Sequence, residues 1–139
     1  NIFLKESDCM DIKKAINIAK ETRLNACADK YFVGACLVTK DEKYYSGCNI
    51  ENDGIQSICA ERTAFVKALS EGEHEFSYIV VVGGFKDNPI LEKCLPCGYC
   101  RQFMKQYVDS NFKIYTCFGE NDIIEEYTIS DLLPHSFSL

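Results

Sequence analysis

The chain lacks the features typical of membrane, secreted and nucleic-acid-binding proteins. No apolar run in its 139 residues approaches the roughly 20 residues that a membrane-spanning helix needs. No signal-peptide pattern marks the N-terminus, so we expect a cytoplasmic protein. A basic stripe is also missing. The net charge of −6 argues against binding to DNA or RNA, which requires Lys and Arg at the phosphates.

Internal repeats, low-complexity segments and linkers are absent as well. Hydrophobic residues make up 47% of the sequence, which is enough for a real core in a chain of this length. We therefore expect one globular domain spanning residues 1–139.

Cysteine, by contrast, is abundant. The nine cysteines are odd in number and irregularly spaced, which favours a metal site and buried free thiols over a disulfide framework. Five of them are most simply interpreted as small core residues: Cys9, Cys27, Cys36, Cys48 and Cys117.

The hydrophobic pattern predicts helices and strands in alternation. A first amphipathic helix, capped by Ser7 or Asp8, fades near Arg23, and the apolar run 78–83 is the clearest strand. The other predicted elements are strands 31–38 and 43–50, helix 58–70, helix 96–109, strands 112–117 and 124–128, and a capped turn at 130–133. This order predicts a mixed sheet with helices packed on it.

Two short motifs carry the chemistry. Cys59-Ala60-Glu61-Arg62 opens one predicted helix, and Pro96-Cys97-Gly98-Tyr99-Cys100 opens another. Cys97 and Cys100 are three residues apart, so they share a helix face, and Cys59 supplies a third thiolate. Zn²⁺ held by three protein ligands keeps its fourth position open for water, as in catalytic sites.

Glu61 and Arg62 complete this hypothesis. Glu61 lies too close in sequence to Cys59 to join it easily in one tetrahedral shell, so we expect it to transfer protons instead. Three thiolates carry more charge than the ion neutralises, and we assign Arg62 a hydrogen bond to them as compensation. The two motifs match the His-x-Glu and Pro-Cys-x-x-Cys signature of zinc deaminases, with Cys59 in place of His.

Three other interpretations of these cysteines are open. Cys94 could join the three thiols in a closed structural zinc site, which would need no Glu61 and would make the protein a non-enzymatic binding domain. An iron–sulfur site lacks the longer cluster spacings. Inert buried thiols would require three aligned cysteines and a flanking Pro96 by coincidence.

At the level of the whole chain, the sequence resembles the small homotetrameric cytidine deaminases. The matching blocks run in family order over nearly the whole length: residues 33–35, 47–52, 59–64, 70–72, 96–102 and 132–134. The resemblance implies a three-layer α/β/α sandwich with a five-stranded mixed sheet, a Zn²⁺ cofactor and a homotetramer. It implies a hydrolase of pyrimidine salvage that converts cytidine and deoxycytidine to uridine and deoxyuridine.

The same resemblance assigns residues to roles. Cys59, Cys97 and Cys100 would hold zinc, with Glu61 as the proton shuttle. Asn49 and Glu51 would bind the ribose hydroxyls, and two buried polar partners there would reject substrates without a free sugar. The resemblance also implies that the backbone N–H of Ala60 binds the pyrimidine carbonyl and that Tyr31 lies near the base. Phe137 would reach the site of a neighbouring subunit.

Some positions around the expected pocket depart from the family. Residues 26–29 replace its Pro-Tyr-Ser, and the loop 53–58 is one residue short and lacks an aromatic. A deaminase of a modified cytosine nucleoside, resembling blasticidin S deaminase, is therefore the alternative function. That class departs at the Asn49/Glu51 block, which this chain keeps, so cytidine and deoxycytidine are the preferred substrates. A polynucleotide-editing deaminase is disfavoured by the acidic charge.

Overall fold

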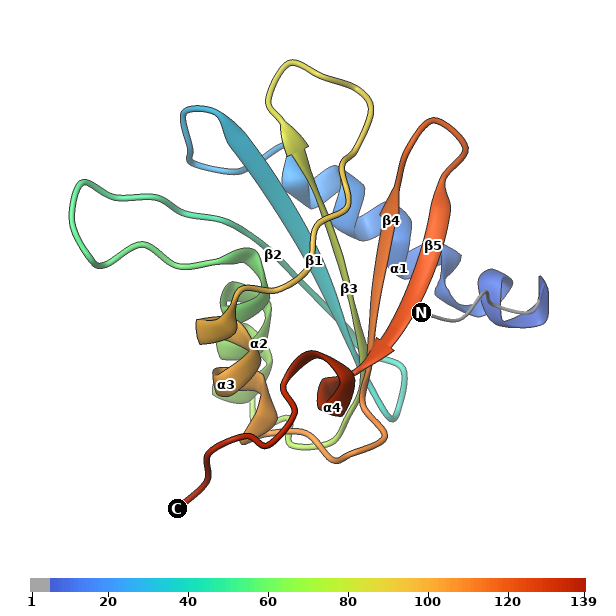
Figure 1. Ribbon diagram of the computed structural model, residues 1–139, viewed down its shortest axis with the longest axis vertical. Coiled ribbons are helices and arrows are strands. Elements are labelled where there is room, and N and C mark those ends of the chain that lie inside the picture. The colour runs from blue at the N-terminus through green and yellow to red at the C-terminus, as the bar shows by residue number, and fades with distance from the viewer. Residues whose placement is uncertain (1–5) are drawn as a thin grey trace.

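The fold is built on one mixed β-sheet covered by helices (Figure 1). The structure is a computed structural model that describes the backbone of residues 6–139 and the side chains of residues 12–139. The elements in chain order are α1 (Glu6–Arg23), β1 (Tyr31–Thr39), β2 (Tyr44–Cys48), α2 (Ala60–Ser70), β3 (Phe76–Phe85), α3 (Gly98–Lys105), β4 (Lys113–Phe118), β5 (Ile123–Thr128) and α4 (Ile129–Leu132).

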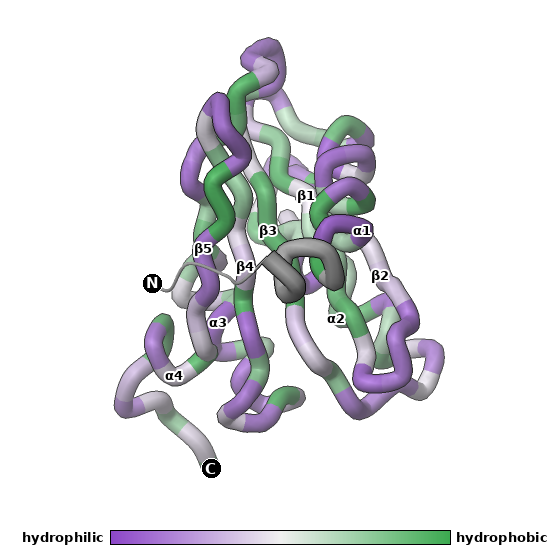
Figure 2. Tube along the Cα trace, turned by 90° about the vertical axis from the view of Figure 1, so that its right-hand side faces the viewer, coloured by the Kyte–Doolittle hydropathy of each residue, from purple (hydrophilic) through white to green (hydrophobic). Residues whose placement is uncertain are grey.

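The sheet has five strands in the order β2-β1-β3-β4-β5. β1 pairs antiparallel with both β2 and β3, β3 pairs parallel with β4, and β5 returns antiparallel along β4. The central strands β1 and β3 are buried over most of their length, whereas the edge strand β5 is half-exposed. Figure 2 shows β3 as a largely hydrophobic strand inside the fold.

Alternate residues of the central strands belong to two separate hydrophobic cores, because successive side chains of a strand point to opposite faces of the sheet. Ala35, Leu37, Ile79 and Val81 pack with α2 on one face. Their neighbours Cys36, Val38, Val80 and Val82 pack with α1 on the other. With α2 and α3 covering one face and α1 the other, the predicted three-layer α/β/α sandwich with a five-stranded mixed sheet is confirmed.

Two glycines let helices lie directly on the sheet. A Cβ at Gly34 would meet the carbonyl oxygen of Ala19 in α1. A Cβ at Gly47 would lie 2.5 Å from the carbonyl oxygen of Ala60 in α2. The second contact holds the N-terminus of α2 against the end of β2, and so fixes the position of the Cys59 motif.

Several boundaries and one burial prediction were wrong. α3 begins at Gly98 rather than Pro96 because Cys97 is the extended N-cap residue. The capped turn predicted at 130–133 is α4, which begins one residue earlier and is capped by Thr128. α1 begins at Glu6, so Ser7 and Asp8 lie inside the helix. Cys36, Cys48 and Cys117 are buried as expected, but Cys27 is exposed. Its backbone is hydrogen-bonded to Asn49 and Glu51, whereas its thiol has only a long contact of 4.0 Å to the carbonyl oxygen of Asn25. The side chain of Cys9 lies outside the described residues.

Within residues 6–139, none of the helices has the length and apolar character required to cross a membrane.

Candidate metal centre and active site

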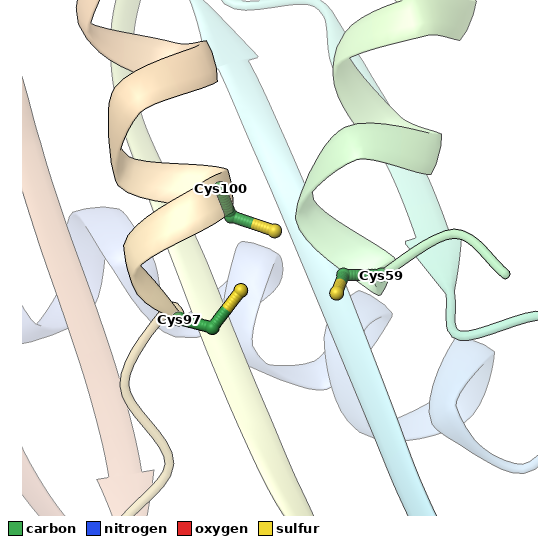
Figure 3. A group of neighbouring side chains, drawn as sticks. All are labelled: Cys59, Cys97 and Cys100. Atoms are coloured by element: carbon green, nitrogen blue, oxygen red, sulfur yellow. The ribbon is translucent and has the colours of Figure 1, made fainter. Parts of the chain in front are cut away.

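Three thiols from two helix N-termini converge on one point (Figure 3). Cys59 is the N-cap residue of α2, Cys97 is the N-cap residue of α3, and Cys100 lies in the first turn of α3. Their sulfur atoms all lie within 4.8 Å of one another. This is the only such group of potential metal ligands found in the described part of the chain. The structure therefore brings together the three cysteines that the sequence singled out.

Core packing brings the two helices side by side. The ring of Phe65 in α2 lies 6.3 Å from Phe103 in α3, and also contacts Phe76 and Phe112. The first in-helix hydrogen bonds are Thr63 N–H to Cys59 and Arg101 N–H to Cys97, which leaves the preceding N–H groups of both helices free of helical partners. Both positive helix ends thus face the sulfur atoms, where they favour negative charge.

Hydrogen bonding within the cluster shifts the pKa values of two of its thiols in opposite directions. The hydrogen bond from Cys100 is the largest cause that lowers the pKa of Cys59, to about 5, and Arg62 contributes. The same shared proton, together with burial, raises the pKa of Cys100. Arg62 Nη2 lies 3.8 Å from the Cys59 sulfur. Arg62 thus contacts the Cys59 thiol of the cluster, and its role in balancing the charge of the thiolates stays a prediction.

Glu61 is buried beside the thiol cluster, with 4% of its surface exposed. It lies in the first turn of α2, two residues after Cys59. Burial raises the pKa of Glu61 to about 7, because a charged carboxylate loses its hydration there, and a negative Cys59 adds to the effect. A carboxyl group whose pKa lies near neutrality can both accept and return a proton at physiological pH.

A cavity of about 430 Å³ connects these groups to polar side chains at the end of β2. Its wall includes Cys59, Ala60, Glu61, Cys97, Arg62, Asn49 and Glu51. A volume of this size suits a small ligand. The cavity thus opens on both the thiol cluster and the Asn49/Glu51 block.

Asn49 is buried and held by backbone on both sides of its amide. Its Oδ1 accepts from Val33 N–H at 2.8 Å, and its Nδ2 donates to the carbonyl oxygen of Tyr31 at 2.9 Å. Nδ2 also lies 3.4 Å from a carboxylate oxygen of Glu51, which is exposed. The expectation of two buried partners therefore holds for Asn49 and not for Glu51, because Glu51 stands at the base of an exposed loop.

Comparison with known proteins identifies the family. Residues 6–116 match the family model described as cytidine and deoxycytidylate deaminase zinc-binding region. The chain belongs to this family. It is 39% identical over 132 residues to a cytidine deaminase of Sporosarcina psychrophila, with 93% of each chain covered. It is 29% identical over 114 residues to a blasticidin-S deaminase of Bacillus cereus, with 79% of each covered.

A solved structure supports the same conclusion. The crystal structure of a cytidine deaminase from Burkholderia pseudomallei has a TM-score of 0.77 and 35% identity, covering 90% of this chain and 98% of that one. The deaminase fold predicted from sequence is therefore confirmed.

The thiol cluster fits the zinc of this deaminase family. Cys sulfur is a preferred Zn²⁺ ligand, and tetrahedral bonds of about 2.3 Å place two such sulfurs about 3.8 Å apart. The spacing within 4.8 Å needs only a small closure to reach that value. Zinc is thus the cofactor that the family and this donor set support.

Cys94 lies apart from the cluster, which bears on the closed four-cysteine alternative. It is absent from the group of mutually close ligands among the described residues. Its sulfur instead lies against Gly83, 2.7 Å from where a Cβ would stand, and burial raises its pKa to about 12. A thiol that is turned toward β3 and lies outside the group of mutually close sulfur atoms is poorly placed to be a fourth ligand.

Tyr31 and Phe137 are not brought to the cavity wall within this chain. The ring of Tyr31 packs edge-on against Phe85 at 5.3 Å, and burial raises the pKa of its hydroxyl to about 12. Phe137 is 66% exposed, and its carbonyl oxygen accepts from Gln102 Nε2 at 3.1 Å. Their predicted roles at the base and in a neighbouring subunit's site stay predictions.

Arg23 is a buried residue that the sequence analysis missed. It is 5% exposed, and its guanidinium donates to the carbonyl oxygens of Phe32, Gly84 and Phe85. Asn49 binds the backbone of Tyr31 and Val33, and Arg23 binds that of Phe32 between them. Side chains therefore fix the backbone of β1 at three consecutive residues at its start. The signal was present in the sequence: Arg23 continues the apolar stripe of Ile12, Ile16 and Ala19 at helical spacing.

Proposed function

We propose that the protein is a hydrolase that deaminates cytidine and deoxycytidine to uridine and deoxyuridine, releasing ammonia. The observation that carries this proposal is a buried carboxylate, Glu61, beside three convergent thiols in one cavity with Asn49 and Glu51. A closed structural metal site does not need a buried carboxyl group such as Glu61 facing a cavity, whereas a catalytic site does.

The cysteines would serve as anchors and Glu61 as the acid–base group. Cys59, Cys97 and Cys100 would hold the zinc, which supplies a Lewis acid that makes water a better nucleophile. Glu61 takes a proton from the attacking water and delivers it to the ring nitrogen beside the amine-bearing carbon. Glu61 then takes the remaining proton of the added hydroxyl group and passes it to the amine, which leaves as ammonia while the carbonyl group of the product forms. Its pKa of about 7 suits both directions of transfer.

The substrate is held at the sugar and at the pyrimidine carbonyl. Asn49 and Glu51 would bind the ribose hydroxyls, with the exposed Glu51 carboxylate as the free acceptor. The N–H of Ala60, at the start of α2 where helical partners are lacking, would donate to the carbonyl. In this scheme Tyr31 lies near the base, and Arg62 balances the charge of the thiolates through its contact with Cys59.

We further infer a homotetramer in the cytoplasm, formed from one domain per chain. Phe137 is 66% exposed in the C-terminal segment, which Gln102 of α3 holds through the Phe137 carbonyl oxygen, so its ring is available to a neighbouring subunit's site. The described cysteines are all free thiols, as expected in a reducing compartment. Light scattering after size exclusion tests the tetramer, and Phe137→Ala should lower activity without releasing zinc.

A deaminase of a modified cytosine nucleoside is the second candidate, favoured by the 29% identity to blasticidin-S deaminase. One panel decides between them: ammonia release from cytidine, deoxycytidine, blasticidin S and single-stranded DNA at equal concentration. We expect cytidine and deoxycytidine to react, and the DNA to be inert. Turnover of blasticidin S alone would favour the second candidate. A zinc-loaded protein that leaves all four untouched would overturn the proposed function.

A further inference from the structure

Tyr99 lies at the metal centre, yet none of the roles above uses it. It stands in the first turn of α3 between Cys97 and Cys100, and its side chain is 70% exposed. The guanidinium carbon of Arg62 lies 4.5 Å from the centroid of its ring. The Tyr99–Arg62 stack therefore joins α3 to α2 beside the sulfur atoms that both helices supply.

Besides Tyr99, the Arg62 guanidinium contacts two thiols of the cluster and one backbone carbonyl oxygen. Its Nη2 reaches the Cys59 sulfur at 3.8 Å and the carbonyl oxygen of Ser57 at 3.5 Å, and both contacts are long. Its Nε is buried without a hydrogen-bond partner among the described side chains. None of the ion pairs formed by residues 12–139 includes Arg62. The guanidinium therefore lies between the thiols of Cys59 and Cys100 on one side and the ring of Tyr99 on the other.

We propose that Tyr99 is a positioning residue that holds the Arg62 guanidinium beside Cys59 and thereby strengthens zinc binding. This proposal rests on the metal role of the three cysteines in the proposed function. A cation is attracted to the negative face of an aromatic ring, and the attraction adds to packing. Without the ring, the long and flexible Arg62 side chain gains freedom by turning into water, where a guanidinium is well solvated.

The gain from this arrangement is electrostatic. Three thiolates around Zn²⁺ leave a net negative charge, so a positive charge fixed next to one sulfur stabilises the loaded site. Groups that orient or support metal ligands commonly change metal affinity when they are removed. Tyr99 acts one step further out, through Arg62, so its expected effect is smaller than that of Arg62 itself.

The test is zinc affinity, measured on the full chain by competition with a chromophoric chelator. Tyr99→Leu keeps the side-chain bulk but removes the aromatic face, and should weaken zinc binding about threefold. Tyr99→Phe keeps the ring face and should bind zinc as the wild type does. Tyr107→Leu is the matched control, because Tyr107 is also partly exposed but packs on Phe103 at 5.2 Å. It should leave zinc affinity unchanged.

The decisive comparison repeats Tyr99→Leu in an Arg62→Gln background. If Tyr99 acts through Arg62, the second substitution adds no further loss once Arg62 is gone. An equal loss in both backgrounds, or no loss in the wild-type background, overturns the role of Tyr99 while zinc binding by the wild type still supports the proposed function. A wild-type protein that binds no zinc overturns both.

Discussion

On one side of the cavity, Cys59 and Cys97 lie at the N-termini of two helices that pack together through the rings of Phe65 and Phe103. On the other side, Glu51 follows β2 in the long loop that leads to α2 (Figure 1), and Ile55 in this loop is 99% exposed. The groups proposed for the reaction are fixed by the core of a single chain, whereas the groups proposed to bind the sugar are held by backbone hydrogen bonds at the end of the sheet. Substitutions on the first side should abolish chemistry, and those on the second should change binding.

The largest expected effect is loss of the metal. Cys100 is fully buried, and its sulfur has both other thiols as neighbours. Cys100→Ser should remove bound zinc and reduce turnover below detection, because a serine hydroxyl is a poor zinc ligand. Zinc content by elemental analysis, together with ammonia release, checks this. Cys36→Ser is the control, because Cys36 is also buried but lies in the core on the α1 face of the sheet. This variant should keep its zinc. If it loses as much zinc as Cys100→Ser, the loss reflects disturbed folding rather than a missing ligand.

Glu61→Gln should come next, with turnover reduced about 10²- to 10⁴-fold while zinc is retained. Gln has the same shape but cannot transfer the proton. Elemental analysis and steady-state kinetics on the same sample separate the two properties. Loss of zinc from this variant would mean that Glu61 supports the metal rather than the proton transfer.

The same substitution should change how the stability of the metal-free protein depends on pH. The folded-state pKa of Glu61, about 7, lies above its ordinary value of 4.5. Between these values the folded state binds more protons than the unfolded state, so the unfolding free energy falls as pH rises. Relative to Glu61→Gln, the wild type should lose on the order of 3 kcal/mol across this window. Denaturant titrations of both metal-free proteins from pH 4.5 to 8 test this, and parallel curves would contradict it.

The smallest effect is expected on the sugar side. Glu51→Gln keeps the size of an exposed side chain but weakens its acceptor, so KM for cytidine should rise about tenfold with kcat nearly unchanged. Steady-state kinetics with cytidine and with a nucleoside lacking the ribose hydroxyls should show a smaller change for the latter. An equal change for both substrates would argue against a ribose contact. Glu120→Gln, an exposed glutamate in the turn between β4 and β5, is the control.

The fold and the reaction groups were predictable because they depend on local patterns. The continuous apolar run of β3 predicted a central strand, and three aligned cysteines predicted a cluster. The start of α3 was misplaced because Pro96 suits a first helical position in general, while here Cys97 takes the extended conformation of a cap.

Contacts between distant elements could not be predicted in this way. The exposure of Cys27 depends on its backbone pairing with Asn49 and Glu51, more than 20 residues away. The stacking of Tyr99 on Arg62 depends on how closely two helices pack. The burial of Arg23 could have been predicted, since its position on the apolar stripe of α1 indicates a buried side chain.

The most direct test of the central claim is X-ray absorption at the zinc edge of the purified protein. An open catalytic centre built by Cys59, Cys97 and Cys100 predicts three sulfur ligands and one light-atom ligand on each zinc. Four sulfur ligands would show that Cys94 closes the site, and would contradict both the open position and the role of Glu61.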